Sequence, residues 1–420
     1  MVANSVARGI RLIPQGANTG LVGASVPDAS GRQAVISTDR LRTAPVIDPV
    51  ERTALVAAGT RLSEVNAAAA ADGLYLPIDL GADPMIGGMV AANTGGARFL
   101  RHGDMRRRTL GLTVVLPDAD GTAVTLGGLR KDNSGLDWKH LFIGTGGAFG
   151  LVTEAVVELA NLPARTAAAL LVPSGADAVP RLLVALERDW GEMLSAFEMM
   201  SGPAIRAAFD HVPSLRDPFA DGAPDLALLV EVAETGPDAG GASLDERLQH
   251  SLGTLWEAET DLLTDAVFGP PEDLWSLRHA ISEGVRMSGR LVAFDLGFRR
   301  GAVMAFREAV RAPLAAFDAD LLICDFGHVG DGGLHLNLIL PHGLDRPREW
   351  EDRLRDLVVG LTRDHGGSFS AEHGIGPKNQ RFHDAWAHPQ ALRLADGIRD
   401  ALTLSPMAAP RLGTPEGDPR

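Results

Sequence analysis

The chain has 420 residues, of which 45% are hydrophobic and 22% charged, as expected for a globular protein with two or three domains. Its formal net charge of −15 argues against a nucleic-acid partner, because binding to phosphates needs clustered Lys and Arg. No apolar run approaches the ~20 residues of a transmembrane helix. The single cysteine, Cys324, cannot form an intrachain disulfide, and its apolar neighbours predict a buried thiol. We therefore expect a soluble cytoplasmic protein.

The first part of the chain combines short strands with one clear helix. Runs of apolar and β-branched residues predict strands over Ile10–Ile13, Ala34–Ser37, Ala54–Ala58, Leu112–Leu116 and Val152–Leu159. Helical spacing of apolar residues predicts a helix over Leu62–Ala71, which Gly73 would cap.

Three Gly-rich segments accompany these strands and are candidates for contact with a ligand. Residues 14–21 (PQGANTGL) could present several backbone N–H groups to a pyrophosphate, although an ordinary polar turn is an equal alternative for this segment alone. Residues 77–96 and 142–150 are mostly small, so their backbone could lie against a flat ring. No Rossmann or Walker fingerprint occurs in the first segment. Together the three segments predict a ligand as large as a dinucleotide.

The rest of the chain mixes helices with strands. Leu226–Val232, Asp320–Phe326 and Leu334–Leu340 are predicted strands, and apolar residues at helical spacing predict helices over Ala302–Phe317 and Trp350–His365. This mixture favours an α+β fold with mainly antiparallel sheets over one doubly wound sheet.

A second constellation lies near the C-terminal end. His328 and His335 flank a Gly-Asp-Gly-Gly turn, and alternation along a strand would place His335 and Asn337 on one face. Two neutral imidazoles suit a divalent metal, and Glu372, followed by His373, supplies a carboxylate. The alternative is that these histidines only form hydrogen bonds in a Gly-rich loop. The combination of both motifs favours a metal or substrate site.

The Gly-rich segments, in this order and spacing, resemble the PCMH-type FAD-binding domain of the vanillyl-alcohol oxidase and p-cresol methylhydroxylase superfamily. Residues 14–27, 77–103 and 131–152 carry the match, which is closest to the branch of D-2-hydroxyglutarate and D-lactate dehydrogenases. The resemblance implies a two-subdomain FAD-binding domain over residues 1–162, an α+β FAD-linked oxidase C-terminal domain over 163–403, and a tail over 404–420.

The resemblance also implies the residues that bind FAD. The first segment would hold the pyrophosphate, the second the isoalloxazine and ribityl part, and the third the adenosine. Because the first segment has no histidine, we expect FAD to bind non-covalently, with His102 a less favoured attachment point. The implied FAD contacts are Pro14, Gln15, Gly16, Ala17, Asn18, Thr19, Gly20, Leu21, Pro77, Asp79, Gly87, Gly88, Ala91, Asn93, Gly95, Gly96, Gly144, Thr145, Gly150 and Val152.

The same branch implies the reaction. A D-2-hydroxy acid, bound between flavin and metal, would be oxidised to the 2-oxo acid, with the hydride passing to flavin N5. The electron acceptor would be a quinone, an electron-transferring flavoprotein or a cytochrome, and a homodimer is compatible with the sequence. The implied metal ligands for zinc, or alternatively manganese, are His328, His335 and Glu372; the base is His373; the substrate contacts are Arg278, Ser282 and Asn337.

The chain departs from the family pattern at several positions. In the family a lysine commonly lies two residues before the position of Asp295, but this chain has Ala293 there, which favours a monocarboxylate or a differently shaped acid as substrate. Ala17 and Gly146 replace a glycine and an acidic residue. Pro14 is preceded by only thirteen residues, and the last dozen residues are expected to be disordered. These departures keep open a degenerate FAD-binding subunit of a glycolate-oxidase-like complex.

Overall fold

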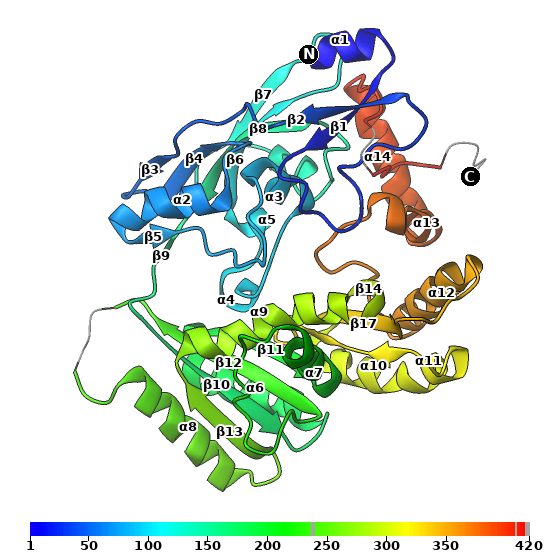
Figure 1. Cartoon of the computed structure of the whole chain (residues 1–420). Helices are drawn as coiled ribbons and strands as arrows, with labels where there is room; N and C mark the ends of the chain where they lie inside the picture. Colours follow the sequence, from blue (N-terminus) through cyan, green and yellow to red (C-terminus); the bar gives the residue numbers. More distant parts are fainter. Residues whose placement is uncertain (237–239, 408–409, 416–420) are drawn as a thin grey trace. The chain divides into compact units, whose positions relative to one another are not determined.

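The computed structural model describes residues 1–236, 240–407 and 410–415. They form two compact units, each with its own sheets (Figure 1). Unit 1 comprises Met1–Gly96, Gly103–Leu162 and Glu372–Arg420. Unit 2 comprises Ala97–His102 and Pro163–Ala371. The domain boundary expected after residue 162 coincides with a junction between the units. Unit 2, however, ends at Ala371, not at residue 403, and the chain from Glu372 onwards belongs to unit 1.

Unit 1 is built on an antiparallel five-stranded sheet with the strand order β3-β4-β8-β6-β7. Two small sheets accompany it, a parallel β1–β2 pair and an antiparallel β5–β9 pair. Its strands are β1 (Arg11–Gln15), β2 (Gln33–Ser37), β3 (Val46–Asp48), β4 (Thr53–Ala57), β5 (Leu74–Tyr75), β6 (Thr109–Val115), β7 (Ala123–Gly127), β8 (Leu151–Glu158) and β9 (Ala160–Asn161). Its helices are α1 (Val2–Ala7), α2 (Leu62–Ala69), η1 (Ala70–Asp72), α3 (Ile86–Ala92), α5 (Met105–Arg108), η2 (Trp138–Leu141), α13 (Gly376–Trp386) and α14 (Pro389–Ala401).

The core of unit 1 explains why the C-terminal segment returns to it. Alternate residues of the five-stranded sheet pack against the apolar faces of α2 and α3. Ala395 of α14 and Leu404 are buried in the same cluster. The helix predicted over Leu62–Ala71 is confirmed as α2 followed by the 3-10 turn η1, which Gly73 caps with φ +68°, a conformation that favours glycine.

Unit 2 contains an eight-stranded sheet with the order β13-β10-β12-β11-β16-β17-β14 and β15 paired to β17. Its strands are β10 (Arg165–Pro173), β11 (Leu194–Ser201), β12 (Leu226–Glu234), β13 (Leu263–Gly269), β14 (Gly289–Gly297), β15 (Leu322–Ile323), β16 (Phe326–Gly327) and β17 (Gly333–Pro341). Its helices are α4 (Phe99–His102), α6 (Ala178–Trp190), η3 (Gly191–Met193), α7 (Gly202–His211), α8 (Leu244–Ala258), α9 (Pro271–Met287), η4 (Arg300–Ala302), α10 (Val303–Ala309), α11 (Arg311–Phe317) and α12 (Glu349–Asp364).

Every strand pair in this large sheet is antiparallel, as predicted. The core formed by α7, α9 and one face of the sheet includes Ala168 and Leu170. The alternate residues Ala167, Ala169 and Leu171 are also buried, so the sheet is covered on both faces. This double burial explains why its central strands are almost entirely apolar and makes any charged residue within them conspicuous.

Two predicted elements of unit 2 are divided in the structure. The helix expected over Ala302–Phe317 is split at Val310 into α10 and α11. Pro313 lacks an N–H and its ring would clash with a carbonyl one turn earlier in a continuous helix. The strand expected over Asp320–Phe326 is wrong at its centre, because β15 pairs with β17 whereas β16 lies between β11 and β17.

The expected disorder of the last dozen residues is wrong for residues 410–415. The Arg411 amide donates to the Gln380 side chain (2.9 Å), and the Thr414 amide donates to Asp396 (2.9 Å). These bonds fasten the segment to α13 and α14. The other residues of the predicted disordered stretch lie outside the described residues.

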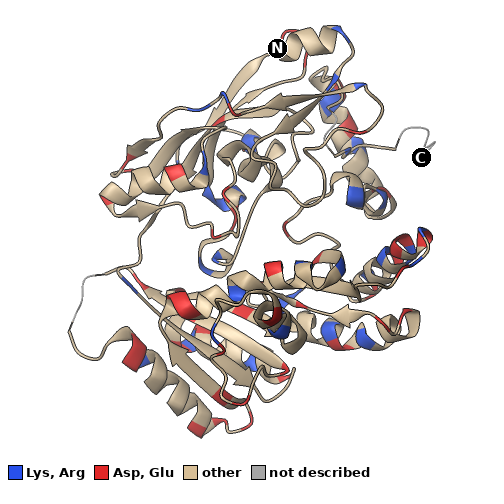
Figure 2. Ribbon diagram, in the orientation of Figure 1, with Lys and Arg blue, Asp and Glu red and all other residues tan. Residues whose placement is uncertain are grey.

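Charged residues of both signs are distributed over the helices of each unit, with α12 an example (Figure 2). Cys324 is buried as predicted, and burial raises the pKa of its thiol to about 12. Among the described residues, no helix combines the length and apolar composition needed to cross a membrane.

Candidate functional site

The three predicted flavin segments, far apart in the sequence, meet within unit 1. The Gly144 amide donates to the carbonyl of Val90 (3.0 Å), which joins the third segment to the second. A Cβ added to Gly147 would lie 2.9 Å from Cγ of Pro14, so the third segment also touches the first. Backbone from three places in the sequence therefore surrounds one region of unit 1.

Glycines in these segments fall into two groups. At Gly87, an added Cβ would lie 2.6 Å from the Ala58 Cβ. At Gly96, with φ +124°, it would lie 2.3 Å from the Asp79 carbonyl oxygen. These two glycines are required by close packing within the protein. Gly88 differs, because no described atom lies within 4 Å of its added Cβ. Because Gly88 has no side chain, a ligand could approach the backbone closely at this position.

This difference predicts opposite effects for two neighbouring substitutions in α3. Gly88→Ala should raise the free energy of unfolding by about 0.5–1 kcal/mol, because alanine is the better helix former, yet lower the retained FAD. Gly87→Ala should lower the free energy of unfolding by about 1–3 kcal/mol through overpacking. Denaturant unfolding and flavin absorbance per protein measure both effects. Full flavin content in Gly88→Ala would remove Gly88 from the FAD contacts.

In unit 2, two histidine rings face each other across the turn between β16 and β17. The Nε2 atoms of His328 and His335 are 3.3 Å apart, and the rings are nearly perpendicular at 82°. The amides of residues 331–333 all donate to the His328 carbonyl, at 3.0–3.1 Å, which fixes the turn. The structure therefore brings the two predicted metal-binding histidines together.

A buried carboxylate supports His328 from behind. Oε1 of Glu198 lies 2.7 Å from Nδ1 of His328. Oε2 accepts a hydrogen bond from Nε of Arg278 (2.9 Å) and forms an ion pair with Nη2 of the same guanidinium (2.7 Å). Burial alone would raise the pKa of Glu198, but its electrostatic interactions and hydrogen bonds with His328 and Arg278 outweigh burial and lower the pKa to about 2. Glu198 is therefore ionised at neutral pH.

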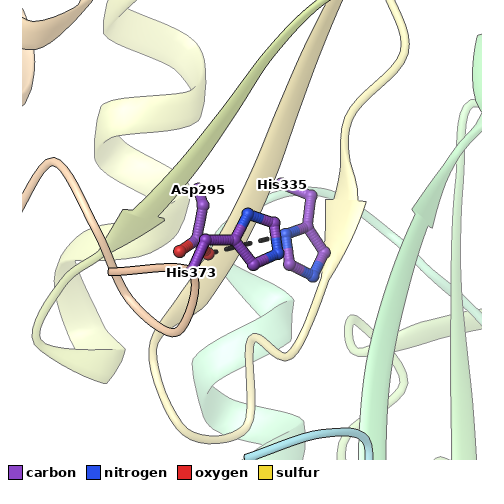
Figure 3. Close-up of side chains that lie close together, drawn as sticks. All are labelled: Asp295, His335 and His373. Atoms are coloured by element: carbon purple, nitrogen blue, oxygen red, sulfur yellow. Dashed lines mark ion pairs between the residues drawn. The ribbon is translucent and has the colours of Figure 1, made fainter. Parts of the chain in front are cut away.

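A second buried carboxylate, Asp295, lies behind His335. Its Oδ1 is 3.7 Å from Nδ1 of His335, an ion pair drawn in Figure 3, which also labels His373. Its other oxygen accepts a hydrogen bond from the Ala371 amide (3.0 Å) and lies 3.4 Å from the Ser370 hydroxyl. Asp295 thus anchors the end of the chain segment that belongs to unit 2 and lies beside a predicted metal ligand.

Glu372 and His373 are the first two residues after that segment. Consecutive Cα atoms lie about 3.8 Å apart, so both residues begin within about 8 Å of the anchored Ala371. Within unit 1, a carboxylate oxygen of Glu372 accepts from the Gly96 amide (3.3 Å). Chain connectivity therefore keeps the predicted third ligand and the predicted base near Ala371.

The predicted substrate contacts lie on two elements. Arg278 is buried in α9, with its guanidinium 4.8 Å from the centre of the Phe326 ring, and Ser282 lies one turn further on and is exposed. Asn337 is buried in β17 on the same face as His335, as the alternation predicted. Arg278 is not a lone cation, since Glu198 already occupies one edge of it.

Comparisons with known proteins match two parts of the chain, whose C-terminal part extends beyond the end of unit 2 at Ala371. Residues 162–403 match the model of the FAD linked oxidases, C-terminal domain, and residues 2–127 match that of the FAD binding domain. The first match alone covers more than half of the chain. The chain belongs to the FAD-linked oxidase family. The predicted FAD cofactor and the two-part α+β architecture are confirmed.

Relatives of this FAD-linked oxidase include proteins named for D-2-hydroxyglutarate. The probable mitochondrial D-2-hydroxyglutarate dehydrogenase of Oryza sativa subsp. indica is 33% identical over 94% of this chain and 69% of its own length. The mitochondrial D-2-hydroxyglutarate dehydrogenase of Bos taurus is 32% identical over 94% of this chain and 71% of its own length. The D-2-hydroxyglutarate dehydrogenase of Xanthomonas citri pv. viticola is 30% identical over 94% of this chain and 82% of its own length. A solved alkyldihydroxyacetonephosphate synthase shares the fold, with a TM-score of 0.69 and 17% identity over 88% of this chain and 69% of its own.

Glu198 is not among the residues of this FAD-linked oxidase that the sequence motifs predicted for the site. It lies in β11, whose sequence is LSAFEMMS. All eight residues of this strand are buried, and the seven apart from Glu198 are apolar or small. A charged residue in a buried strand needs a partner of opposite charge or a function, so its presence was a usable signal. Its partners could not be read from the sequence, because they lie 80 and 130 residues away.

Proposed function

We propose that this FAD-linked oxidase oxidises a D-2-hydroxy acid to the 2-oxo acid, with assistance from a divalent metal and a histidine base. The observation that carries the proposal is the pair His328 and His335, whose Nε2 atoms face each other at 3.3 Å while their Nδ1 atoms face carboxylates. The relatives named for D-2-hydroxyglutarate support the substrate class. A degenerate FAD-binding subunit is not favoured, because these relatives match 94% of this chain.

The donor atoms at the histidine pair fit a divalent metal. A histidine that donates its Nδ1 proton to a carboxylate presents a lone pair at Nε2. Glu198, 2.7 Å from Nδ1, favours this state of His328. The carboxylate of Asp295, 3.7 Å from Nδ1 of His335, attracts a proton at that nitrogen electrostatically. Two nitrogen ligands of a tetrahedral zinc at 2.0–2.1 Å would be separated by about 3.3–3.4 Å, close to the 3.3 Å found here. We infer zinc, with manganese as the alternative, and Glu372 as the third ligand.

The remaining residues of the proposed site bind substrate and move the proton. When bound, FAD supplies the hydride acceptor, and the metal lowers the pKa of a hydroxyl that it contacts. Arg278 binds the substrate carboxylate through its free edge, and Asn337 and Ser282 add polar contacts. His373 accepts the hydroxyl proton on an imidazole nitrogen, the role of a general base.

The proposed substrate is a monocarboxylate. Ala293 is exposed on β14 and pairs in register with Asn337, at the position where the family resemblance would place a lysine. Ala293→Lys is expected to raise kcat/KM for a five-carbon dicarboxylic 2-hydroxy acid relative to D-lactate about 10- to 100-fold, because a charged hydrogen bond contributes about 1.5–3 kcal/mol. Steady-state kinetics with both acids gives this ratio. Ala293→Met is the control for side-chain length, and an equal change in that variant would contradict the interpretation.

Anaerobic flavin reduction tests the proposed function directly. The purified protein would be mixed with D- and L-2-hydroxy acids, with and without a chelator, while absorbance near ~450 nm is followed, since flavin carries the redox chemistry. Bleaching by one D-acid that the chelator suppresses is the expected result. A bound flavin that no acid in the panel reduces would refute the dehydrogenase proposal. Bleaching that is unchanged by the chelator would refute the proposed role of the metal.

The acceptor and the cellular location stay predictions. We propose that electrons leave to a quinone, an electron-transferring flavoprotein or a cytochrome. A cytoplasmic location and a homodimer rest on the sequence alone, and the relatives from Oryza sativa and Bos taurus are named mitochondrial.

A further inference from the structure

Glu198 joins two parts of the proposed site that come from different elements. It lies in β11, while His328 lies in the turn after β16 and Arg278 lies in α9. One carboxylate oxygen faces His328 and the other faces Arg278. Only 1% of Glu198 is exposed, so these two partners, and not water, compensate its charge.

Each contact restricts its partner to one state. For His328, a carboxylate oxygen 2.7 Å from Nδ1 favours the tautomer that carries its proton there and leaves Nε2 directed at His335. For Arg278, Glu198 occupies the edge formed by Nε and Nη2. The guanidinium plane is thereby fixed, and Nη1 with the second Nη2 proton remains for another carboxylate.

We propose that Glu198 is a positioning residue that sets the metal-binding tautomer of His328 and the substrate-binding edge of Arg278 together. This inference rests on the proposed function for its consequence in catalysis, but the tautomer and the orientation are properties of the protein itself. A glutamine of the same shape has one acceptor oxygen. Arg278 has only donors and needs that oxygen, so the NH₂ group would be turned towards Nδ1 of His328, which can accept from it only in the other tautomer.

The chain offers a matched control in Glu231 of the neighbouring strand β12. This buried carboxylate also pairs with an arginine, Arg98, and it accepts hydrogen bonds from the Trp275 indole (2.7 Å) and the Ser195 hydroxyl. Among the contacts described for Glu231 there is no histidine. Glu231→Gln therefore removes a buried charge of the same kind without changing a proposed metal ligand.

Two measurements compare Glu198→Gln with Glu231→Gln in the full-length, FAD-loaded protein. The zinc dissociation constant, from competition with a chromophoric chelator, is expected to rise about 10- to 100-fold in Glu198→Gln and to stay within about threefold in Glu231→Gln. In the metal-free protein, ¹⁵N NMR of labelled histidines, with the His328 signal assigned by its loss in His328→Gln, is expected to show the Nδ1-protonated tautomer in wild type and Glu231→Gln. That tautomer should be lost or mixed in Glu198→Gln.

An unchanged tautomer in folded Glu198→Gln would overturn the proposal, and so would equal effects in the two variants. If Glu198→Gln does not fold, Glu198→Asp keeps the charge beside Arg278 but is one methylene too short to reach both partners. If Glu198→Asp then bound zinc as tightly as wild type and kept the same His328 tautomer, the proposal would be overturned. Failure of wild type to bind zinc would refute the proposed metal, whereas the tautomer comparison would still decide the role of Glu198.

Discussion

Replacement of His335 by alanine is expected to lower kcat/KM for the D-2-hydroxy acid by on the order of 10³. A bound metal contributes several kcal/mol to the stabilisation of developing charge, and each 1.36 kcal/mol corresponds to a factor of ten. His335 supplies one of the two facing Nε2 atoms, so its removal leaves His328 without the second nitrogen of the pair. Steady-state kinetics and metal content by elemental analysis measure the effect.

The chelator provides an internal control for this prediction. Chelated wild type should fall to the rate of His335→Ala, and the variant itself should not respond to the chelator. Flavin absorbance reports whether unit 1 has kept its fold. His342→Ala is the matched variant, because His342 is exposed and follows β17 directly. Chelator-sensitive activity in His335→Ala would contradict its assignment as a ligand.

For His373→Gln we expect kcat to fall about 10²- to 10⁴-fold, the usual contribution of a general base. Glutamine retains the hydrogen-bonding size of the side chain but cannot accept a proton near neutral pH. The zinc dissociation constant and the flavin content should stay close to wild type, because the proposed ligand is the neighbouring Glu372. Single-turnover flavin reduction at saturating substrate measures the chemical step.

Added imidazole separates a base from a structural histidine. It should restore part of the rate of His373→Gln, and the restored rate should rise with pH as the imidazole loses its proton. His383→Gln, in α13 beside Asp384, is the control and should not respond. A loss of metal affinity in His373→Gln as large as the loss of rate would instead make His373 a ligand.

Local patterns predicted β17 well because alternation is a property of a strand itself. The leucines at 334, 336, 338 and 340 are fully buried, and His335 and Asn337 share the other face, as the spacing required. Periodicity was less informative at Ala302–Phe317, where apolar spacing continues through Val310 although the helix does not. One backbone group missing at Pro313 was enough to divide it.

The glycine motifs identified the FAD-binding part of the chain but could not assign the role of each glycine. Gly87 and Gly88 are identical neighbours in the sequence. Only the tertiary structure places Ala58 against the first and leaves the second open. Whether a glycine is present for the fold or for a ligand depends on which distant backbone approaches it, and local sequence does not contain that information.

The sequence by itself determined the family, the strands and helices with strong periodicity, and the residue types of the proposed site. Tertiary structure alone decided that the chain from Glu372 onwards returns to unit 1 and that Glu198 lies behind His328 and Arg278. The physical reason is the same for both. Helix α14 is buried in a core formed by the first 160 residues, and the buried charge of Glu198 is compensated by groups 80 and 130 residues away. Both depend on long-range packing that no local pattern encodes.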